Sequence, residues 1–233
     1  RRASRVVALS PQTARDLQSQ FGLAAEKMAV VPNAIDKAVF RPAFDPSEIR
    51  RSLGLPAEGL MLGTVARLHA DKNHAAIIEA LALLDARGVR ATAVFVGEGP
   101  LRGQLEALAQ ARRVKDRVVF AGRQRPVVPW FQAMDVFVLS STWEGQPLAM
   151  LQALCCRVPV IASRIEGNTA VLGEDDPGLF APTDASALAG LLAEAARGDA
   201  FRRTLLDKQA AVPVPGSDDA AALLKAIYRP LVA

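Results

Sequence analysis

The sequence predicts an α/β fold in which a parallel sheet is doubly wound, with helices on both faces. Short apolar runs alternate with longer segments of helical periodicity through most of the chain, which is the pattern of repeated βα units. Several of these runs lack polar alternates, as strands buried on both faces do. The predicted strands are 6–9, 28–31, 61–66, 91–96, 118–120, 136–139 and 158–162.

Helical periodicity fills the segments between these runs. Over 73–86, the apolar residues Ile77, Leu81 and Leu84 recur on one face of a helix, and 101–111 has the same pattern. Helices that each bury one apolar face are expected to pack against the sheet and complete the sandwich.

Beyond Phe180 the pattern is helical only, with helices predicted over 185–196, 200–211 and 218–228. We expect the terminal segment, 183–233, to pack on one flank of the sheet. A chain of 233 residues with 51% hydrophobic and 22% charged residues can bury a full core. The expectation is therefore a single domain over 1–233.

Composition narrows the classes of function. The two cysteines, Cys155 and Cys156, are adjacent, so they cannot form a disulfide framework, and no Cys/His spacing typical of a metal site occurs. We therefore expect a reducing, cytoplasmic location. No apolar run is long enough to span a bilayer. Nucleic acid is excluded as a partner because aromatic residues make up only 5% of the chain and the basic residues are scattered, although the net charge of +4 mildly favours anionic partners.

Candidate ligand contacts follow the predicted strands, because ligands of open parallel sheets bind beyond the carboxyl ends of the strands. Arg67 and Lys72 come directly after 61–66, in a short connection to a helix. An arginine that grips two oxygens and a lysine that acts as a point charge suit a diphosphate. A solvated loop in which Asp71 is the partner of these cations remains the alternative.

Glycines follow two further strands. Gly97 begins a GxGxxxG segment rather than the GxGxxG of dinucleotide sites, so a tight turn is the preferred interpretation. Gly122 and Arg123 follow the next strand. Their backbone could bind a base edge and the guanidinium could stack on the base, or the segment could be an ordinary loop.

The segment 140–148 carries the most information. Pro147 predicts the first turn of a helix, whose free amides and dipole form an anion site. Glu144 precedes that turn, where its carboxylate could accept hydrogen bonds from sugar hydroxyls, or could simply be an acidic residue at a helix start. Gln152 lies further into the helix, and its side chain is expected to tilt back toward the same ligand.

Six stretches of the chain carry a resemblance through their joint order and spacing. They are VVPNAID at 30–36, ARL at 66–68 followed by KN at 72–73, FVGEGP at 95–100, FAG at 120–122, SSTWEG at 140–145 and RVPVIA at 157–162. Together they resemble the carboxy-terminal domain of GT-B glycosyltransferases of the family-4 type (glycosyl transferases group 1). The resemblance covers about 6–196 and implies a Rossmann-like fold that binds a nucleotide-diphosphate sugar.

The resemblance also implies a role for each matching residue. Arg67 and Lys72 would hold the donor diphosphate and stabilise the leaving group, and Glu144 would contact the donor sugar. The phosphates would meet the segment formed by Gly145, Gln146, Pro147 and Leu148. The base would meet Gly122 and Arg123 beside the turn at Gly97, and the ribose would meet Gln152. Family members are usually retaining transferases that need no metal or other cofactor, and this chain has no Asp-x-Asp motif.

Three positions depart from the family pattern. Gln152 replaces the second of two glutamates that have seven residues between them, which exchanges charge-assisted hydrogen bonds of roughly 1.5–3 kcal/mol for neutral ones of about 0.5–1.5 kcal/mol. Arg157 replaces a glycine at a helix end. Ala170 stands where a glutamate is common. The expectation is weaker donor binding and less efficient turnover.

The resemblance further implies a second, amino-terminal domain that binds the acceptor and for which this sequence has no room. We expect the 233-residue chain to bind a UDP- or GDP-sugar weakly and to transfer nothing by itself. The acceptor would be a glycan or glycolipid in surface polysaccharide or lipopolysaccharide assembly, with possible peripheral contact with the inner face of the membrane. The alternatives are a non-catalytic nucleotide-sugar-binding module and a nucleotide-sugar epimerase.

Three smaller features carry expectations of their own. Trp143 either lines a sugar pocket or packs beneath its loop. Cys155 and Cys156 are interpreted as packing residues, and Asp175 and Asp176 as solvated residues of a turn.

Overall fold

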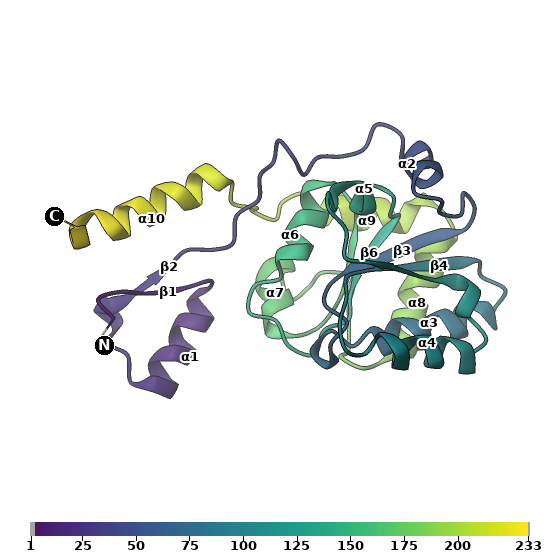
Figure 1. Cartoon of the computed structure of the whole chain (residues 1–233), viewed down its shortest axis with the longest axis horizontal. Helices are drawn as coiled ribbons and strands as arrows, with labels where there is room; N and C mark the ends of the chain where they lie inside the picture. The colour runs from purple at the N-terminus through teal and green to yellow at the C-terminus, as the bar shows by residue number, and fades with distance from the viewer. Residues whose placement is uncertain (1–2, 233) are drawn as a thin grey trace.

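A six-stranded parallel sheet forms the centre of the main body in the computed structural model, which describes residues 3–232 (Figure 1). Its order is β5-β4-β3-β6-β7-β8. The strands are β3 (Leu60–Val65), β4 (Ala91–Val96), β5 (Val118–Gly122), β6 (Val136–Leu139), β7 (Val160–Ser163) and β8 (Leu179–Phe180). The order reverses between β3 and β6, which places the topological switch point of the sheet between these two strands.

Helices cover both faces of this sheet, so the prediction of a doubly wound α/β fold is confirmed. Alternate side chains of β3 show the two cores: Leu62 packs with the first group of helices and Met61 with the second. The first group is α3 (His74–Asp85), α4 (Arg102–Ala111), α8 (Ala185–Ala196) and α9 (Asp199–Gln209). The second is α5 (Val128–Gln132), α6 (Leu148–Cys155) and α7 (Glu166–Leu172), with α2 (Pro46–Ser52) beside them.

Local sequence explains where several of these helices begin. The carboxylate of Asp45 caps α2 by accepting hydrogen bonds from the N–H groups of Ser47 and Glu48, and Asp184 caps α8 through the N–H of Ala187. Every residue of β4 is buried, as its unbroken apolar run predicts.

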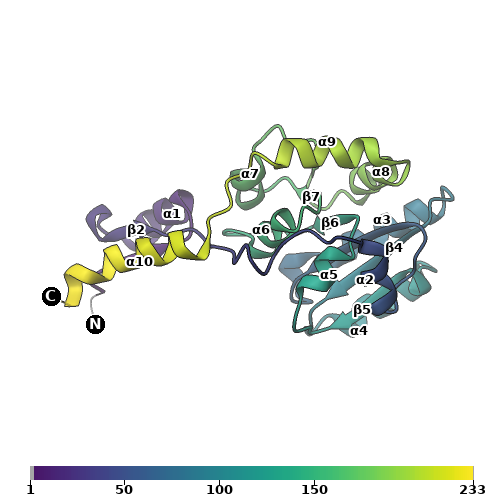
Figure 2. The same cartoon turned by 90° about the horizontal axis from the view of Figure 1, so that it is seen from above.

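A small lobe lies apart from this body. It contains the parallel pair β1 (Val6–Ala8) and β2 (Met28–Val30) and the helix α1 (Pro11–Phe21). Figures 1 and 2 show α10 (Ser217–Val232) on the side of this lobe, away from the six-stranded sheet. Two of the seven predicted strands therefore belong to a separate sheet, and α10 does not cover the flank on which α8 and α9 lie. Three-residue runs with partly exposed side chains give no indication of which sheet they join.

Two segments of chain connect the lobe and the body, and they meet each other. The N–H of Ile35 donates to the carbonyl of Pro215 at 2.9 Å, and Ile35 and Gly216 form a parallel bridge. Within 3–232, no helix combines the length and apolarity required to cross a membrane.

Candidate functional site

The loop after β3 and the loop after β6 are joined at the carboxyl edge of the sheet. The N–H of Thr142 donates to the carbonyl of Asp71 at 2.8 Å, and the Ser140 hydroxyl lies within hydrogen-bond distance of the carbonyls of Lys72 and Asn73. Because the carboxyl ends of neighbouring parallel strands share one edge, the two segments predicted to carry chemistry lie together.

The side chains of Lys72 and Glu144 form an ion pair across this junction. The Nζ of Lys72 lies 2.8 Å from Oε1 of Glu144 and 3.3 Å from Oδ2 of Asp71. The Ser141 hydroxyl donates to the same Oε1 at 2.7 Å. No group of the described chain donates to the other Glu144 oxygen, Oε2, which is therefore available to a ligand hydroxyl.

Asp71 and His74, next to this pair, both have pKa values below the usual ones. Burial alone would raise the pKa of Asp71, but the hydrogen bond from His69 and the charge of Lys72 hold it below its usual value. His74, at the start of α3, is buried against Phe95. Burial, helped by Lys72 and opposed by Asp71, lowers the pKa of His74 to about 4, so the ring is neutral at pH 7.

One pocket, of about 470 Å³, gathers the central predicted residues. The helix α6 begins at its wall, with Pro147 immediately before the first helical residue. Within the part of the chain that the structure describes, the N–H groups of Leu148 and Ala149 donate to no carbonyl. They are the free donors expected at a helix start. The pocket is lined by Val65, Ala66, Arg67, Lys72, Leu139, Glu144, Pro147, Leu148, Ala149 and Gln152.

Other predicted residues lie outside this pocket. Gly122 ends β5 with a left-handed φ of 69°, and its carbonyl accepts a hydrogen bond from the N–H of Gly97 at 2.8 Å. A Cβ on Gly97 would lie 2.0 Å from the carbonyl oxygen of Ala66, so the turn after β4 closes tightly on the loop after β3. The tight-turn interpretation is confirmed. Arg123 is exposed beside it.

Gln146 makes a contact that the sequence did not predict. Its Oε1 accepts a hydrogen bond from the N–H of Asn33 at 2.5 Å, and its carbonyl accepts one from Nδ2 of Asn33 at 3.0 Å. The side chain of Gln146 therefore ties the loop after β6 to the segment between the small lobe and the body. This interaction joins residues 113 positions apart and has no local signature.

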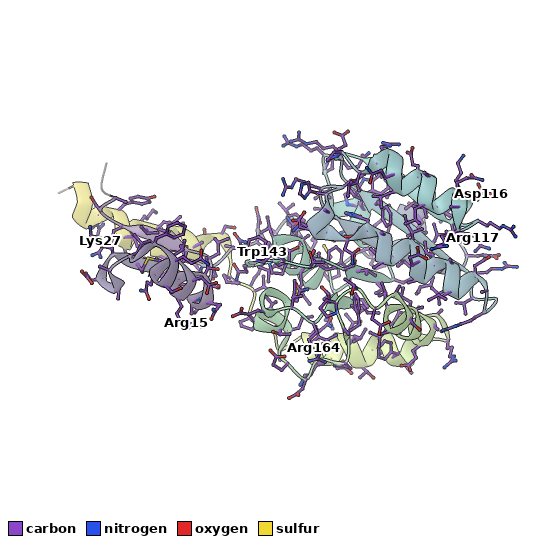
Figure 3. The ribbon with its side chains drawn as sticks, turned by 90° about the horizontal axis from the view of Figure 1, so that it is seen from below. Arg15, Lys27, Asp116, Arg117, Trp143 and Arg164 are labelled. Atoms are coloured by element: carbon purple, nitrogen blue, oxygen red, sulfur yellow. The ribbon has the colours of Figure 1, made fainter. Side chains whose placement is uncertain are left out.

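A second pocket, of about 370 Å³, lies between α1 of the small lobe and the same loop. Figure 3 shows Trp143 at this junction. The indole is 69% exposed and lines the pocket, so the alternative that it packs beneath its loop is wrong. Gly145 and Ala170 line the pocket too, and Glu144 lines both pockets.

Four residues of this second pocket were missed from the sequence. Gln12, Thr13, Asp16 and Gln20 lie on α1, and their polar side chains face the Trp143 loop across the pocket. Polar residues at helical spacing in an amphipathic segment look like an ordinary solvated face. Only the position of the small lobe makes them lining residues.

The expectations for the two cysteines and the two aspartates have different outcomes. Burial raises the pKa of Cys156 to about 12, and burial also raises the pKa of Cys155, in spite of Lys37 nearby, so both thiols are protonated at pH 7. Asp175 is exposed, as predicted, but the prediction that Asp176 is solvated is wrong. Asp176 is buried, and its carboxylate accepts hydrogen bonds from Gln209 at 3.2 Å and from the N–H of Gly178 at 2.8 Å. The turn composition gave no sign that α9 would cover Asp176.

Two family models match the chain. The family described as Glycosyl transferases group 1 matches residues 45–210, and the one described as Glycosyltransferase Family 4 matches residues 1–39. The boundary between them falls in the segment that connects the small lobe to the body.

Curated relatives and solved structures agree with this assignment. A putative glycosyltransferase, EpsF of Bacillus subtilis (strain 168), is 33% identical over 162 residues, which are 69% of this chain and 42% of the relative. A UDP-Gal:alpha-D-GlcNAc-diphosphoundecaprenol alpha-1,3-galactosyltransferase of Escherichia coli is 33% identical over 158 residues, 66% of this chain and 41% of the relative. The chain thus spans about two fifths of the length of these relatives.

Among solved structures, Anabaena Alr3699/HepE in complex with UDP and glucose superposes with a TM-score of 0.81 at 24% identity, over 99% of this chain and 63% of that one. The C-terminal domain of a group 1 family glycosyl transferase (LpcC) from Francisella tularensis gives a TM-score of 0.67 at 23% identity, over 76% of this chain and 95% of that one. These likenesses show the fold. With the family match over most of its length, the chain belongs to the glycosyl transferases group 1 family, and its body has the Rossmann-like fold of the carboxy-terminal half of GT-B glycosyltransferases.

Proposed function

We propose that the pocket at the start of α6 binds the diphosphate and sugar of a nucleotide-sugar donor for glycosyl transfer. The observation that carries this proposal is the convergence of Arg67, Lys72 and the free amides of α6 on one pocket, with Glu144 paired to Lys72 in its lining. Cations and open helix amides suit phosphate oxygens, and a carboxylate suits sugar hydroxyls.

Binding of a donor would change the partners of the ion pair between Lys72 and Glu144. A diphosphate that enters the pocket supplies a new counter-charge for Lys72, and Oε2 of Glu144, which has no donor in the described chain, is directed to hydroxyls of the sugar. Arg67 and Lys72 then stabilise the negative charge that develops on the leaving nucleoside diphosphate. In our proposal these side-chain cations supply the compensating positive charge, and no metal takes part.

The nucleoside lies toward Gly122 and Arg123 in this proposal, near the turn at Gly97. Gln152 lines the pocket and would accept a hydrogen bond from a ribose hydroxyl. A glutamate there would make a charge-assisted bond, so Gln152→Glu is expected to tighten nucleotide binding about fivefold, for a gain of roughly 1 kcal/mol.

The sugar would extend from the first pocket into the second, because Glu144 lines both. The face of Trp143 is an apolar surface of the kind on which sugar rings stack, and the polar side chains of α1 face it. We propose that an acceptor glycan or glycolipid approaches from the side of α1 and that transfer retains the anomeric configuration. Among the relatives, a lipopolysaccharide core biosynthesis mannosyltransferase, LpsB of Rhizobium meliloti (strain 1021), supports a role in lipopolysaccharide or surface polysaccharide assembly. Protonated thiols at Cys155 and Cys156 are compatible with a cytoplasmic location.

Uridine and guanosine diphosphates are the expected ligands, in line with the UDP bound to Anabaena Alr3699/HepE. Isothermal titration calorimetry with UDP, GDP, ADP and the corresponding monophosphates tests this directly. Arg67→Ala should weaken diphosphate binding more than tenfold, since a charge-assisted interaction is worth roughly 1.5–3 kcal/mol. Arg87→Ala is the matched control, because Arg87 is also exposed but lies outside the pocket. Failure of every nucleotide to bind, or equal losses in both variants, would overturn the proposal.

A non-catalytic nucleotide-sugar-binding module is the second candidate, and it is favoured by Gln152 and Ala170, which line the two pockets without the usual carboxylates. Radiolabelled UDP-sugar incubated with glycan and glycolipid acceptors separates the two, with Glu144→Ala as the inactive reference. The assay uses a protein as long as the relatives. If it transfers the sugar and Glu144→Ala does not, the enzyme is supported. If it binds the donor but transfers no sugar, the binding module is supported.

A further inference from the structure

A third pocket, of about 360 Å³, lies on the outer side of α6, away from the proposed donor site. The segment 36–45 runs over α6 and α5 toward α2 (Figure 1) and forms one wall. Its apolar lining comes from Phe40, Pro42, Leu154, Ala210, Val212 and Val214. Cations lie beside these apolar side chains, so the pocket is amphipathic.

Three cations line the pocket: Lys37, Arg41 and Arg157. None of the three forms an ion pair with a carboxylate in the described range, and no aspartate or glutamate lines the pocket. The carboxylates at the two ends of the segment, Asp36 and Asp45, accept hydrogen bonds from backbone N–H groups instead. The positive charge here is thus uncompensated.

Exposed apolar side chains continue the same surface. Val39 is 50% exposed, and Phe44 is fully exposed at the end of the segment. Exposed apolar side chains lose their hydrophobic stabilisation in water. The segment 37–44 thus combines two of them, Val39 and Phe44, with two of the three cations, and Arg157 adds the third from the end of α6.

We propose that this surface, consisting of 37–44 and Arg157, docks on a bilayer that contains anionic phospholipid. The three cations attract the phosphate headgroups, and the rings and aliphatic groups of Phe44 and Val39 enter the interfacial region. Charge complementarity favours an anionic partner, because the pocket is lined by three cations and no acidic group. The exposed side chains of Val39 and Phe44 beside these cations favour a bilayer over a soluble anion. The proposal is independent of the donor site, so it stands or fails separately from the proposed function.

Co-sedimentation of the 233-residue chain with vesicles tests the proposal. Vesicles of phosphatidylcholine with 30% phosphatidylglycerol, about as a bacterial membrane contains, should bind the chain, and vesicles of phosphatidylcholine alone should not. The double variant Lys37→Gln/Arg41→Gln should lower the partition coefficient about 25-fold, since each cation near an anionic surface contributes roughly a factor of five. Phe44→Ser should lower it about tenfold, and raising the salt concentration should weaken binding.

Matched variants make the result specific. Arg87→Gln/Lys115→Gln removes the same charge from exposed cations that pair with no carboxylate in the described residues, and Phe21→Ser removes an exposed aromatic ring from the small lobe. All four variants should keep the thermal midpoint of the parent chain. No binding to anionic vesicles, equal binding to neutral ones, or equal losses in test and control variants would each overturn the proposal.

Discussion

Two cation–carboxylate pairs lie at opposite ends of the six-stranded sheet, and they differ in what surrounds them. At the amino ends of the strands, Arg50 lies 2.7 Å from Asp135, with side chains 8% and 24% exposed. At the carboxyl ends, Lys72 lies 2.8 Å from Glu144, with side chains 15% and 11% exposed. Their burial is similar, so burial alone does not tell a structural pair from a functional one.

The hydrogen-bond partners separate the two pairs. Nε of Arg50 donates to the carbonyl of Ala133, and the second oxygen of Asp135 accepts from the N–H of Met61, so backbone groups hold both members. Glu144 instead has a carboxylate oxygen to which no group of the described chain donates. Both pairs line a pocket, so a pocket alone does not separate them. A carboxylate with an oxygen that no protein group occupies can accept a hydrogen bond from a ligand, and this makes the Lys72–Glu144 pair the better candidate for ligand binding.

The largest expected effect is on stability, from breaking the Arg50 pair. Arg50→Ala leaves the Asp135 carboxylate buried without its cation, which should lower the free energy of unfolding by about 3–5 kcal/mol. Urea denaturation measures this, and calorimetry of the folded variant should show unchanged UDP affinity. The double variant Arg50→Met/Asp135→Asn keeps an acceptor for the Met61 N–H and should recover most of the loss. An effect of Arg50→Ala on affinity alone would remove the distinction between the pairs.

Acid should destabilise the chain through His74, which lies near the Lys72–Glu144 pair and not near the Arg50–Asp135 pair. Its pKa in the folded protein is about 4, below the ordinary value of 6.5, so folding favours the neutral ring. This stabilisation is complete above pH 6.5 and is lost as the pH falls toward 4, for a total of roughly 3 kcal/mol. Denaturation curves between pH 7 and pH 4 measure it. His74→Phe, which keeps an aromatic ring against Phe95, should remove that part of the pH dependence; an identical pH profile for the variant would contradict the assignment.

The Lys72 pair should show the opposite behaviour to the Arg50 pair. Lys72→Met removes a charge-assisted contact to phosphate and should weaken UDP binding by roughly 1.5–3 kcal/mol, at least tenfold. The free energy of unfolding should fall by less than in Arg50→Ala, because the Ser141 hydroxyl still donates to the Glu144 oxygen that Lys72 contacts. Calorimetry and denaturation of the same sample test both statements. A large loss of stability without a loss of affinity would make this pair structural as well.

The smallest expected effect is at the end of α6. Arg157 has a left-handed φ of 54°, and the N–H of Val158 donates to the carbonyl of Ala153, an arrangement in which glycine is normally preferred. Arg157→Gly should raise the free energy of unfolding by about 0.5–1 kcal/mol, as measured by thermal or urea denaturation. Arg157→Ala retains a Cβ and should give no such gain, so equal stabilisation by both variants would point to another cause.

Much of the body could be predicted from the sequence because its strands are continuous apolar runs and its ligand edge follows from parallel topology. The runs at 91–96 and 136–139 match β4 and β6 residue for residue. The same rule brought Arg67, Lys72, Glu144 and Gln152 into one pocket.

The small lobe and its contacts could not be predicted in this way. A run of three partly exposed residues, such as β1, is compatible with several sheets. The contacts of Gln146 with Asn33, and of the Trp143 loop with α1, depend on how the lobe sits against the body. Asp176 is buried because Gln209 approaches from a distant helix, and no local pattern records that.

The meeting of Ile35 with Pro215 and Gly216 has a mechanical consequence. Both described segments that cross between lobe and body pass this bridge, so a rotation of the lobe about it would move the two segments together. Such a rotation would break the hydrogen bonds between Asn33 and Gln146 and change the gap between α1 and Trp143, and it would leave the spacing of strands within the body unchanged.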